Sequence, residues 1–104
     1  MHVHEMLNTH PLAEEGVPDA DSLGLDSLSD CVAACYDCAQ ACTSCADACL
    51  AEEGVESLRR CIALNLACAD VCAATGSVAS RLTERDAGLL AAQLRACAEA
   101  CRVC

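Results

Sequence analysis

The side chains that could do chemistry in this sequence are its twelve cysteines, which fall in regular rows instead of isolated pairs. Residues 31–49 read CVAACYDCAQACTSCADAC, with six cysteines separated by steps of 4, 3, 4, 3 and 4. Five steps cover 18 residues, so the mean step is 3.6, the period of an α-helix. A helix over this segment would carry all six thiols on one face. Thiolates are ligands for soft metals such as Cu(I) and zinc.

Packing alone is the alternative interpretation of such a row, because free cysteine also behaves as a small hydrophobic residue. Six thiols in unbroken order, with no Leu, Ile, Phe or Met between them, would fill a core poorly. The opposite face carries Asp37, Gln40, Ser44 and Asp47, which suit a solvated surface. We therefore interpret the row as metal ligands.

Two further segments continue the pattern. Residues 58–82 place three cysteines in the middle of a helical stripe, with Asn65 among them and apolar residues at both ends. Asn65 could pair with a backbone group or lend an oxygen to a metal. Residues 96–104 read ACAEACRVC and resemble the first row. The predicted metal ligands are Cys31, Cys35, Cys38, Cys42, Cys45, Cys49, Cys61, Cys68, Cys72, Cys97, Cys101 and Cys104.

The rows predict an all-α fold, an antiparallel helical bundle with long helices at residues 27–53, 55–81 and 84–104. Short capping-box patterns, Ser27 to Asp30 and Thr83 to Asp86, suggest where the first and third helices begin. Gly54 suits the turn between the first two helices. The second helix is apolar on several faces, so we expect a subunit interface there.

Residues 1–26 are expected to form an N-terminal arm and linker, and residues 27–104 the cysteine-lined bundle. A short helix before Pro11 is a further option. All three histidines, His2, His4 and His10, lie in this arm, either as additional metal ligands or as part of a polar terminus.

Composition limits the function. A net charge of −10, with six arginines and no lysine, argues against nucleic acid and against anionic membrane surfaces, which recruit basic patches. The N-terminus lacks the basic and apolar regions of a signal peptide, and no apolar run approaches the roughly 20 residues that span a bilayer. We therefore expect a cytoplasmic protein whose thiols stay reduced, for which this many cysteines indicates metal or redox chemistry.

Spacing favours Cu(I) over the other soft metals. Zinc sites need four converging ligands, and iron–sulfur motifs rely on irregular backbone, whereas a straight row of helical thiols is expected to give pairs. Two or three thiolates suffice for Cu(I), and each sulfur can bridge successive ions. At about one ion per cysteine, monovalent copper would neutralise the thiolates almost one for one.

The motifs resemble those of a known family. The six-cysteine row, Cys61, Asn65, Cys68 and Cys72 on the second helix, ACAEACRVC on the third, and the opening MLNTHP all resemble the cysteine-rich four-helix-bundle copper storage proteins, in their cytosolic branch. That resemblance implies a core filled with Cu(I) thiolates, no catalysis and a homotetramer. A copper chaperone is a possible further partner. We find no counterpart of the family's fourth helix, and three helices would leave one side of the thiol channel open. Either the bundle is a shortened version, or another subunit is expected to cover that side.

Three alternatives remain. The first is a general thiolate protein for zinc or cadmium. The second is a thiol redox protein, which needs a cysteine whose pKa is lowered by a basic neighbour. The only candidates are Arg60 beside Cys61 and Arg102 beside Cys101. The third is a helical hairpin stapled by disulfides after export, although six, three and three cysteines on the successive helices do not pair well. Histidine is confined to the arm, so we do not expect an enzyme.

Overall fold

The computed structural model describes residues 24–104, in which every regular element is a helix. The predicted all-α helical fold is confirmed. The predictions for His2, His4, His10 and a short helix before Pro11 lie outside the described residues. The elements are α2 (Gly24–Leu50), the short 3-10 helix η2 (Val55–Leu58), α3 (Arg59–Ser80) and α4 (Ala87–Val103).

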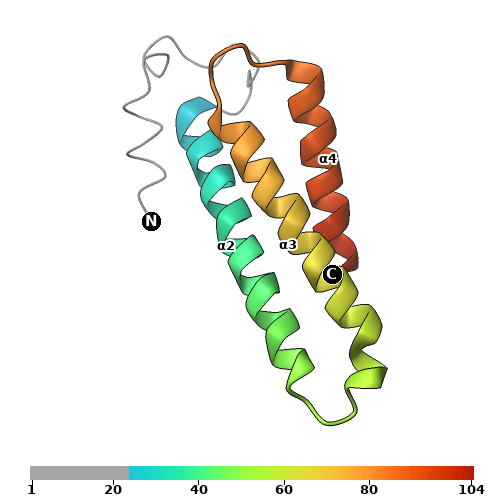
Figure 1. Ribbon diagram of the computed structural model, residues 1–104. Helices are drawn as coiled ribbons and strands as arrows, with labels where there is room; N and C mark the ends of the chain where they lie inside the picture. Colours follow the sequence, from blue (N-terminus) through green and yellow to red (C-terminus); the bar gives the residue numbers. More distant parts are fainter. Residues whose placement is uncertain (1–23) are drawn as a thin grey trace.

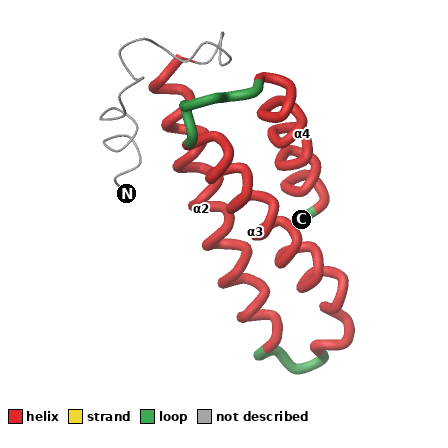
Figure 2. The backbone as a smooth tube through the Cα atoms, turned by 45° about the horizontal axis from the view of Figure 1, so that its top comes forward, coloured by secondary structure: helices red, strands yellow, loops and turns green. Residues whose placement is uncertain are grey.

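The three long helices form an antiparallel bundle with α3 in the middle (Figure 1). Helices α2 and α3 lie side by side along their length, and α4 returns along α3 from the opposite end, so the two connecting loops lie at opposite ends (Figure 2). At 1.5 Å per residue, the 27 residues of α2 span about 40 Å and the 17 residues of α4 about 26 Å. Helix α4 therefore covers only part of the α2–α3 pair.

The core has two chemically different halves. One half is aliphatic, and its buried residues Leu28, Val32, Ala79, Leu82 and Leu90 lie near the α3–α4 loop. The other half is built largely from thiols: the buried residues are Cys42, Cys68, Ala69 and Cys72, with Cys38, Cys97, Ala39 and Ala100 packed against them. Cysteine side chains thus occupy the positions that Leu and Ile take in an ordinary bundle.

The helix ends differ from the predicted bounds by a few residues. Helix α2 begins at Gly24, so Ser27 lies inside the helix and does not cap it. Helix α4 begins at Ala87 because Asp86 is its N-cap: the Asp86 carboxylate accepts a hydrogen bond from the Leu89 N–H at 2.7 Å. Gly54 does adopt the left-handed conformation, with φ of 74°, in the turn that leads into η2.

Helix α3 packs against α2 on one side and α4 on another, but part of its apolar surface stays exposed, including Leu66. Together with η2 it forms a helical segment of 26 residues, Val55–Ser80, in which an 18-residue window has a mean hydropathy of 1.6; by length and composition alone, it could cross a membrane. The sequence-based expectation concerned continuous apolar runs, and polar residues such as Asn65 and Asp70 interrupt this segment. A core helix of a soluble bundle meets the same criterion, and in this structure the segment packs between two other helices.

Candidate metal centre

All twelve cysteines lie in the described part of the chain and carry free thiols. They differ in exposure along the bundle. Cys35, Cys42, Cys68 and Cys72 are buried, whereas Cys45, Cys61, Cys101 and Cys104 are exposed. The remaining four are half-buried: Cys31, Cys38, Cys49 and Cys97.

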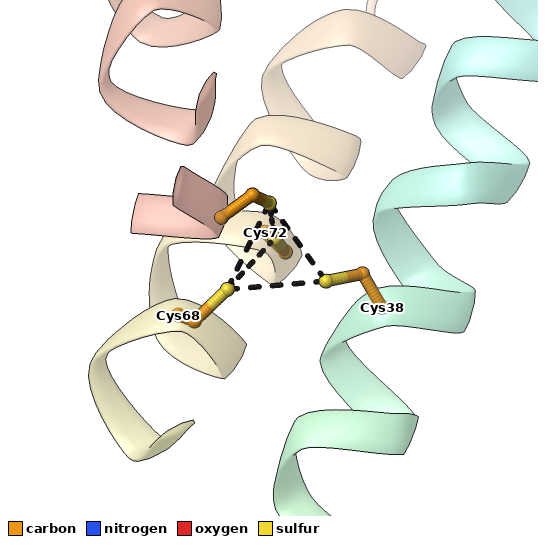
Figure 3. A group of neighbouring side chains, drawn as sticks. Cys38, Cys68 and Cys72 are labelled. Atoms are coloured by element: carbon orange, nitrogen blue, oxygen red, sulfur yellow. Dashed lines mark hydrogen bonds between the residues drawn. The ribbon is translucent and has the colours of Figure 1, made fainter. Parts of the chain in front are cut away.

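Four thiols converge from three helices near the middle of the bundle. Cys38 comes from α2, Cys68 and Cys72 from successive turns of α3, and Cys101 from α4. Their sulfur atoms all lie within 4.8 Å of one another. Figure 3 shows the side chains of Cys38, Cys68 and Cys72 pointing toward one another across the space between α2 and α3. We name Cys38, Cys68, Cys72 and Cys101 the four-thiol cluster.

The sulfur–sulfur distances within the four-thiol cluster are nearly equal. Cys72 lies 3.7 Å from Cys101 and 3.8 Å from Cys68. Cys68 lies 3.8 Å from Cys101, and Cys38 lies 3.9 Å from both Cys68 and Cys101. These sulfurs are in van der Waals contact, so one ion could bind several of them without a large movement of the backbone.

Further thiols extend the cluster in both directions along the bundle. Cys97 lies 3.7 Å from Cys72 on the side of the aliphatic core. On the other side Cys42 lies 3.8 Å from both Cys38 and Cys104, and its sulfur groups with those of Cys68 and Cys104 within 4.8 Å. The result is an unbroken row of sulfurs in contact, formed by Cys38, Cys42, Cys68, Cys72, Cys97, Cys101 and Cys104.

The buried side chain of Asn65 continues this row where α3 has no cysteine. Its Oδ1 accepts a hydrogen bond from the Cys104 thiol at 2.8 Å. Its Nδ2 donates to the sulfurs of Cys45 at 3.3 Å and Cys61 at 3.6 Å. Asn65 therefore pairs with thiols instead of backbone, and it links cysteines on α2, α3 and α4.

The last three cysteines lie at the two ends of the row, next to other thiols. At one end, burial and, after it, the charges and hydrogen bonds of the neighbouring Cys31 and Cys97 together raise the pKa of Cys35 to about 12. At the other end, desolvation and the neighbouring thiols of Cys61 and Cys45 raise the pKa of Cys49. Every predicted ligand thus has at least one other thiol or Asn65 beside it.

Burial also governs protonation in the centre of the row. It raises the pKa of Cys42 to about 11 and moves the pKa values of Cys68 and Cys72 well above the ordinary thiol range. Burial would raise the pKa of Cys38 as well, but hydrogen bonds from neighbouring thiols, first of all Cys72, outweigh it and lower the pKa. At neutral pH the metal-free core is therefore mainly thiol, with Cys38 the most readily ionised of these central groups.

Residues 25–104 match the protein family described as "Csp: Copper storage protein". The chain belongs to the copper storage protein family. Among solved structures, it is similar to the copper storage protein Ccsp from Streptomyces lividans, a structure described as loaded with 10 copper equivalents. The two chains are 43% identical and superpose with a TM-score of 0.87, over 98% of this chain and 73% of the Streptomyces chain. A comparison with curated proteins gave no match.

As a member of this family, the chain has the expected cysteine rows, but two features of its site were not anticipated. A straight row of helical thiols was expected to give pairs, whereas three neighbouring helices bring four sulfurs together. A polar pair also separates the thiol core from the aliphatic core: Gln93 on α4 donates to Thr75 on α3 at 2.9 Å, and the Thr75 hydroxyl donates to the Val71 carbonyl at 2.7 Å. Nothing in the sequence identified Gln93 and Thr75 as partners.

Proposed function

We propose that this copper storage protein holds multiple Cu(I) ions along the row of thiols, with all twelve cysteines named above as ligands. The observation that carries the proposal is the unbroken contact between sulfurs of three helices, from Cys97 to Cys104. Since adjacent sulfurs lie 3.7–3.9 Å apart, each thiolate can bridge ions on either side of it. The copper-loaded Streptomyces relative supports the same choice of metal.

Charge balance supports Cu(I) and a high capacity. A buried row of thiolates could not remain ionised without counter-charge, because burial raises the pKa values of most of its central members. Bridging monovalent ions supply one positive charge each, so about one Cu(I) per cysteine neutralises the row. Loading then releases the thiol protons to solvent.

We further propose that the protein stores copper without catalysis, in the cytoplasm, where a reducing environment keeps the thiols free. Its acidity suits neither nucleic acid nor an anionic membrane surface as a partner. A copper chaperone is the expected donor. Leu50 and Leu66 are exposed, 61% and 46% respectively, and are candidates for the contacts of a homo-oligomer, a tetramer by family resemblance.

The test is an anaerobic titration of the reduced protein with Cu(I) against a competing chelator, counting ions per chain. We expect about one ion per cysteine, with little change in helical circular dichroism. In the double variant Cys68→Ala, Cys72→Ala the count should fall by at least about two, because both sulfurs lie in the centre of the row. The control Ser44→Ala alters only an exposed hydroxyl on α2.

If the double variant does not fold, Cys49→Ser at the end of the row provides the second measurement, with an expected loss of about one ion. A count of one or two ions in the unaltered protein, or a count insensitive to all of these cysteines, would overturn the storage function.

A further inference from the structure

The four-thiol cluster has the geometry of a site for a single divalent ion. Tetrahedral zinc thiolate sites have Zn–S bonds of about 2.3 Å, which places the sulfurs about 3.8 Å from one another. Five of the six separations among Cys38, Cys68, Cys72 and Cys101 are 3.7–3.9 Å. The hole between these four sulfurs therefore already has the size that Zn²⁺ requires.

Four thiol ligands distinguish this position from the rest of the row. The only other group of cysteine sulfurs that converges in the described residues is Cys42, Cys68 and Cys104, which offers three. That group has only three sulfurs and shares Cys68 with the four-thiol cluster, so it does not supply a second zinc ion with four thiolates of its own. Cu(I) is satisfied by two or three thiolates and can use either group, whereas closed zinc sites need four ligands.

We propose that the four-thiol cluster binds one Zn²⁺ as a closed tetrathiolate centre when copper is scarce, and that Cu(I) displaces it on loading. Binding replaces four S–H bonds by four Zn–S bonds and releases the thiol protons to solvent. Three of the four ligands are buried or half-buried, and Cys101 is exposed, which leaves one vertex open to incoming metal. Zinc binding itself does not depend on the copper capacity, because it concerns one ion and one set of four thiols; its displacement rests on the proposed copper storage.

Zinc would also link α4 to α2 and α3, because all three helices supply ligands to the same ion. Cys101 is the only ligand from α4, while Cys38 comes from α2 and the other two from α3. Since the ion binds only the folded arrangement of three helices, it should raise the thermal unfolding temperature of the copper-free protein. Addition of Mg²⁺ to the metal-free protein should not raise its unfolding temperature, because Mg²⁺ prefers oxygen ligands.

The direct experiment is an anaerobic titration of the reduced full chain with Zn²⁺ against a chromophoric zinc chelator, combined with X-ray absorption at the zinc edge. We expect one tightly bound ion per chain, with four sulfur ligands at about 2.3 Å. The variant Cys101→Ser should lower zinc affinity by at least about 100-fold, since even outer-shell changes at zinc sites cost 10–100-fold. The matched control Ala98→Ser introduces the same hydroxyl one turn earlier on the exposed face of α4.

Nitrogen or oxygen ligands at zinc, more than one tight ion per chain, or equal affinities for Cys101→Ser and Ala98→Ser would overturn the inference. Parallel Cu(I) titrations separate its failure from that of the storage function. Cys49→Ser removes a thiol that is not in the cluster, so it should lose copper capacity and keep the zinc ion. Addition of Cu(I) to the zinc form should release one Zn²⁺ per chain to the chelator, and retention of zinc in the copper-filled protein would contradict the displacement.

Discussion

The thiol of Cys104 donates a hydrogen bond to the side-chain oxygen of Asn65, with a sulfur-to-oxygen distance of 2.8 Å. This contact joins the last residue of the chain, at the end of α4, to the middle helix. The amide nitrogen of Asn65 points the other way and donates to Cys45 on α2 and Cys61 on α3. One buried amide thus satisfies its hydrogen bonds within the row of thiols and orients three of them.

Replacement of this amide tests its contribution to the metal-free protein. Asn65→Ala should lower the free energy of unfolding by about 1–2 kcal/mol, because it removes hydrogen bonds to three thiols and leaves a small cavity. Urea denaturation of the reduced apo-protein measures the change. Gln40→Ala is the control, since Gln40 bonds only the exposed Ser44 and should change stability by less than about 0.5 kcal/mol. Equal effects of the two variants would contradict the role given to Asn65.

The ring of Tyr36 determines the outcome of a second substitution, at Gly76. A methyl group at Gly76 would lie 2.9 Å from Cζ of Tyr36, which is too close for any real contact. Gly76→Ala should therefore destabilise the protein by about 1–2 kcal/mol, despite the better helix propensity of alanine. In a Tyr36→Ala background the clash is absent, and the same change should stabilise by up to about 1 kcal/mol. A double-mutant cycle of thermal unfolding measures both, and destabilisation in both backgrounds would refute the explanation.

The buried thiols predict how apo-protein stability varies with pH. Unfolded thiols ionise near the ordinary value of 9.0, whereas burial raises the pKa of Cys42 to about 11 and of Cys35 to about 12. The folded state holds these protons more tightly, so its stability is greatest below about pH 9 and falls as the pH rises through 11 and 12. The pKa of Cys38 is lowered in the folded state, so this thiol contributes an opposite dependence on pH. The larger number of thiols with raised pKa values outweighs it.

Urea denaturation at about pH 8 and about pH 10 should therefore give a lower free energy of unfolding at the higher pH. Cys35→Ala removes one of the titrating groups, so it should reduce this dependence on pH even if it lowers stability at both values. An unfolding free energy that is constant or rises over this range would contradict the pKa shifts.

The N-cap of α4 gives a fourth prediction. Asp86→Ala removes the acceptor of the Leu89 N–H and should cost about 1 kcal/mol of stability. Asp86→Asn keeps a side-chain acceptor at the same position and should retain most of that stability. Thermal unfolding of the two variants provides the comparison. Identical losses would mean that the charge of Asp86, and not its hydrogen bond, stabilises the helix.

The helices and their thiol faces could be predicted because both follow from local period. Six cysteines at a mean step of 3.6 specify one helix face whatever surrounds it. The start of α4 could be located only to within a turn, since Thr83 and Asp86 are both acceptable caps and the fold uses Asp86. Residues 55–80 contain no long continuous apolar run, and their membrane-like mean hydropathy appears only when the whole helix is averaged.

The four-thiol cluster could not be predicted, because it depends on relationships between helices. Cys68 and Cys72 were recognisable as neighbours on one helix from their spacing. Cys38 and Cys101 lie beside them because of the way α2 and α4 pack against α3, and spacing within one helix does not predict that packing. For the same reason Asn65 was recognised as a polar residue in the row, but its three thiol partners were not.

The measurement that tests the central claim most directly is a crystal structure of the copper-loaded protein with anomalous scattering recorded at the copper edge. The storage function predicts a row of copper sites along the bundle between α2, α3 and α4, each bound by two or three cysteine sulfurs and including Cys38, Cys68, Cys72 and Cys101. Copper confined to surface carboxylates or to the histidines of residues 1–23, with an empty thiol row, would contradict it.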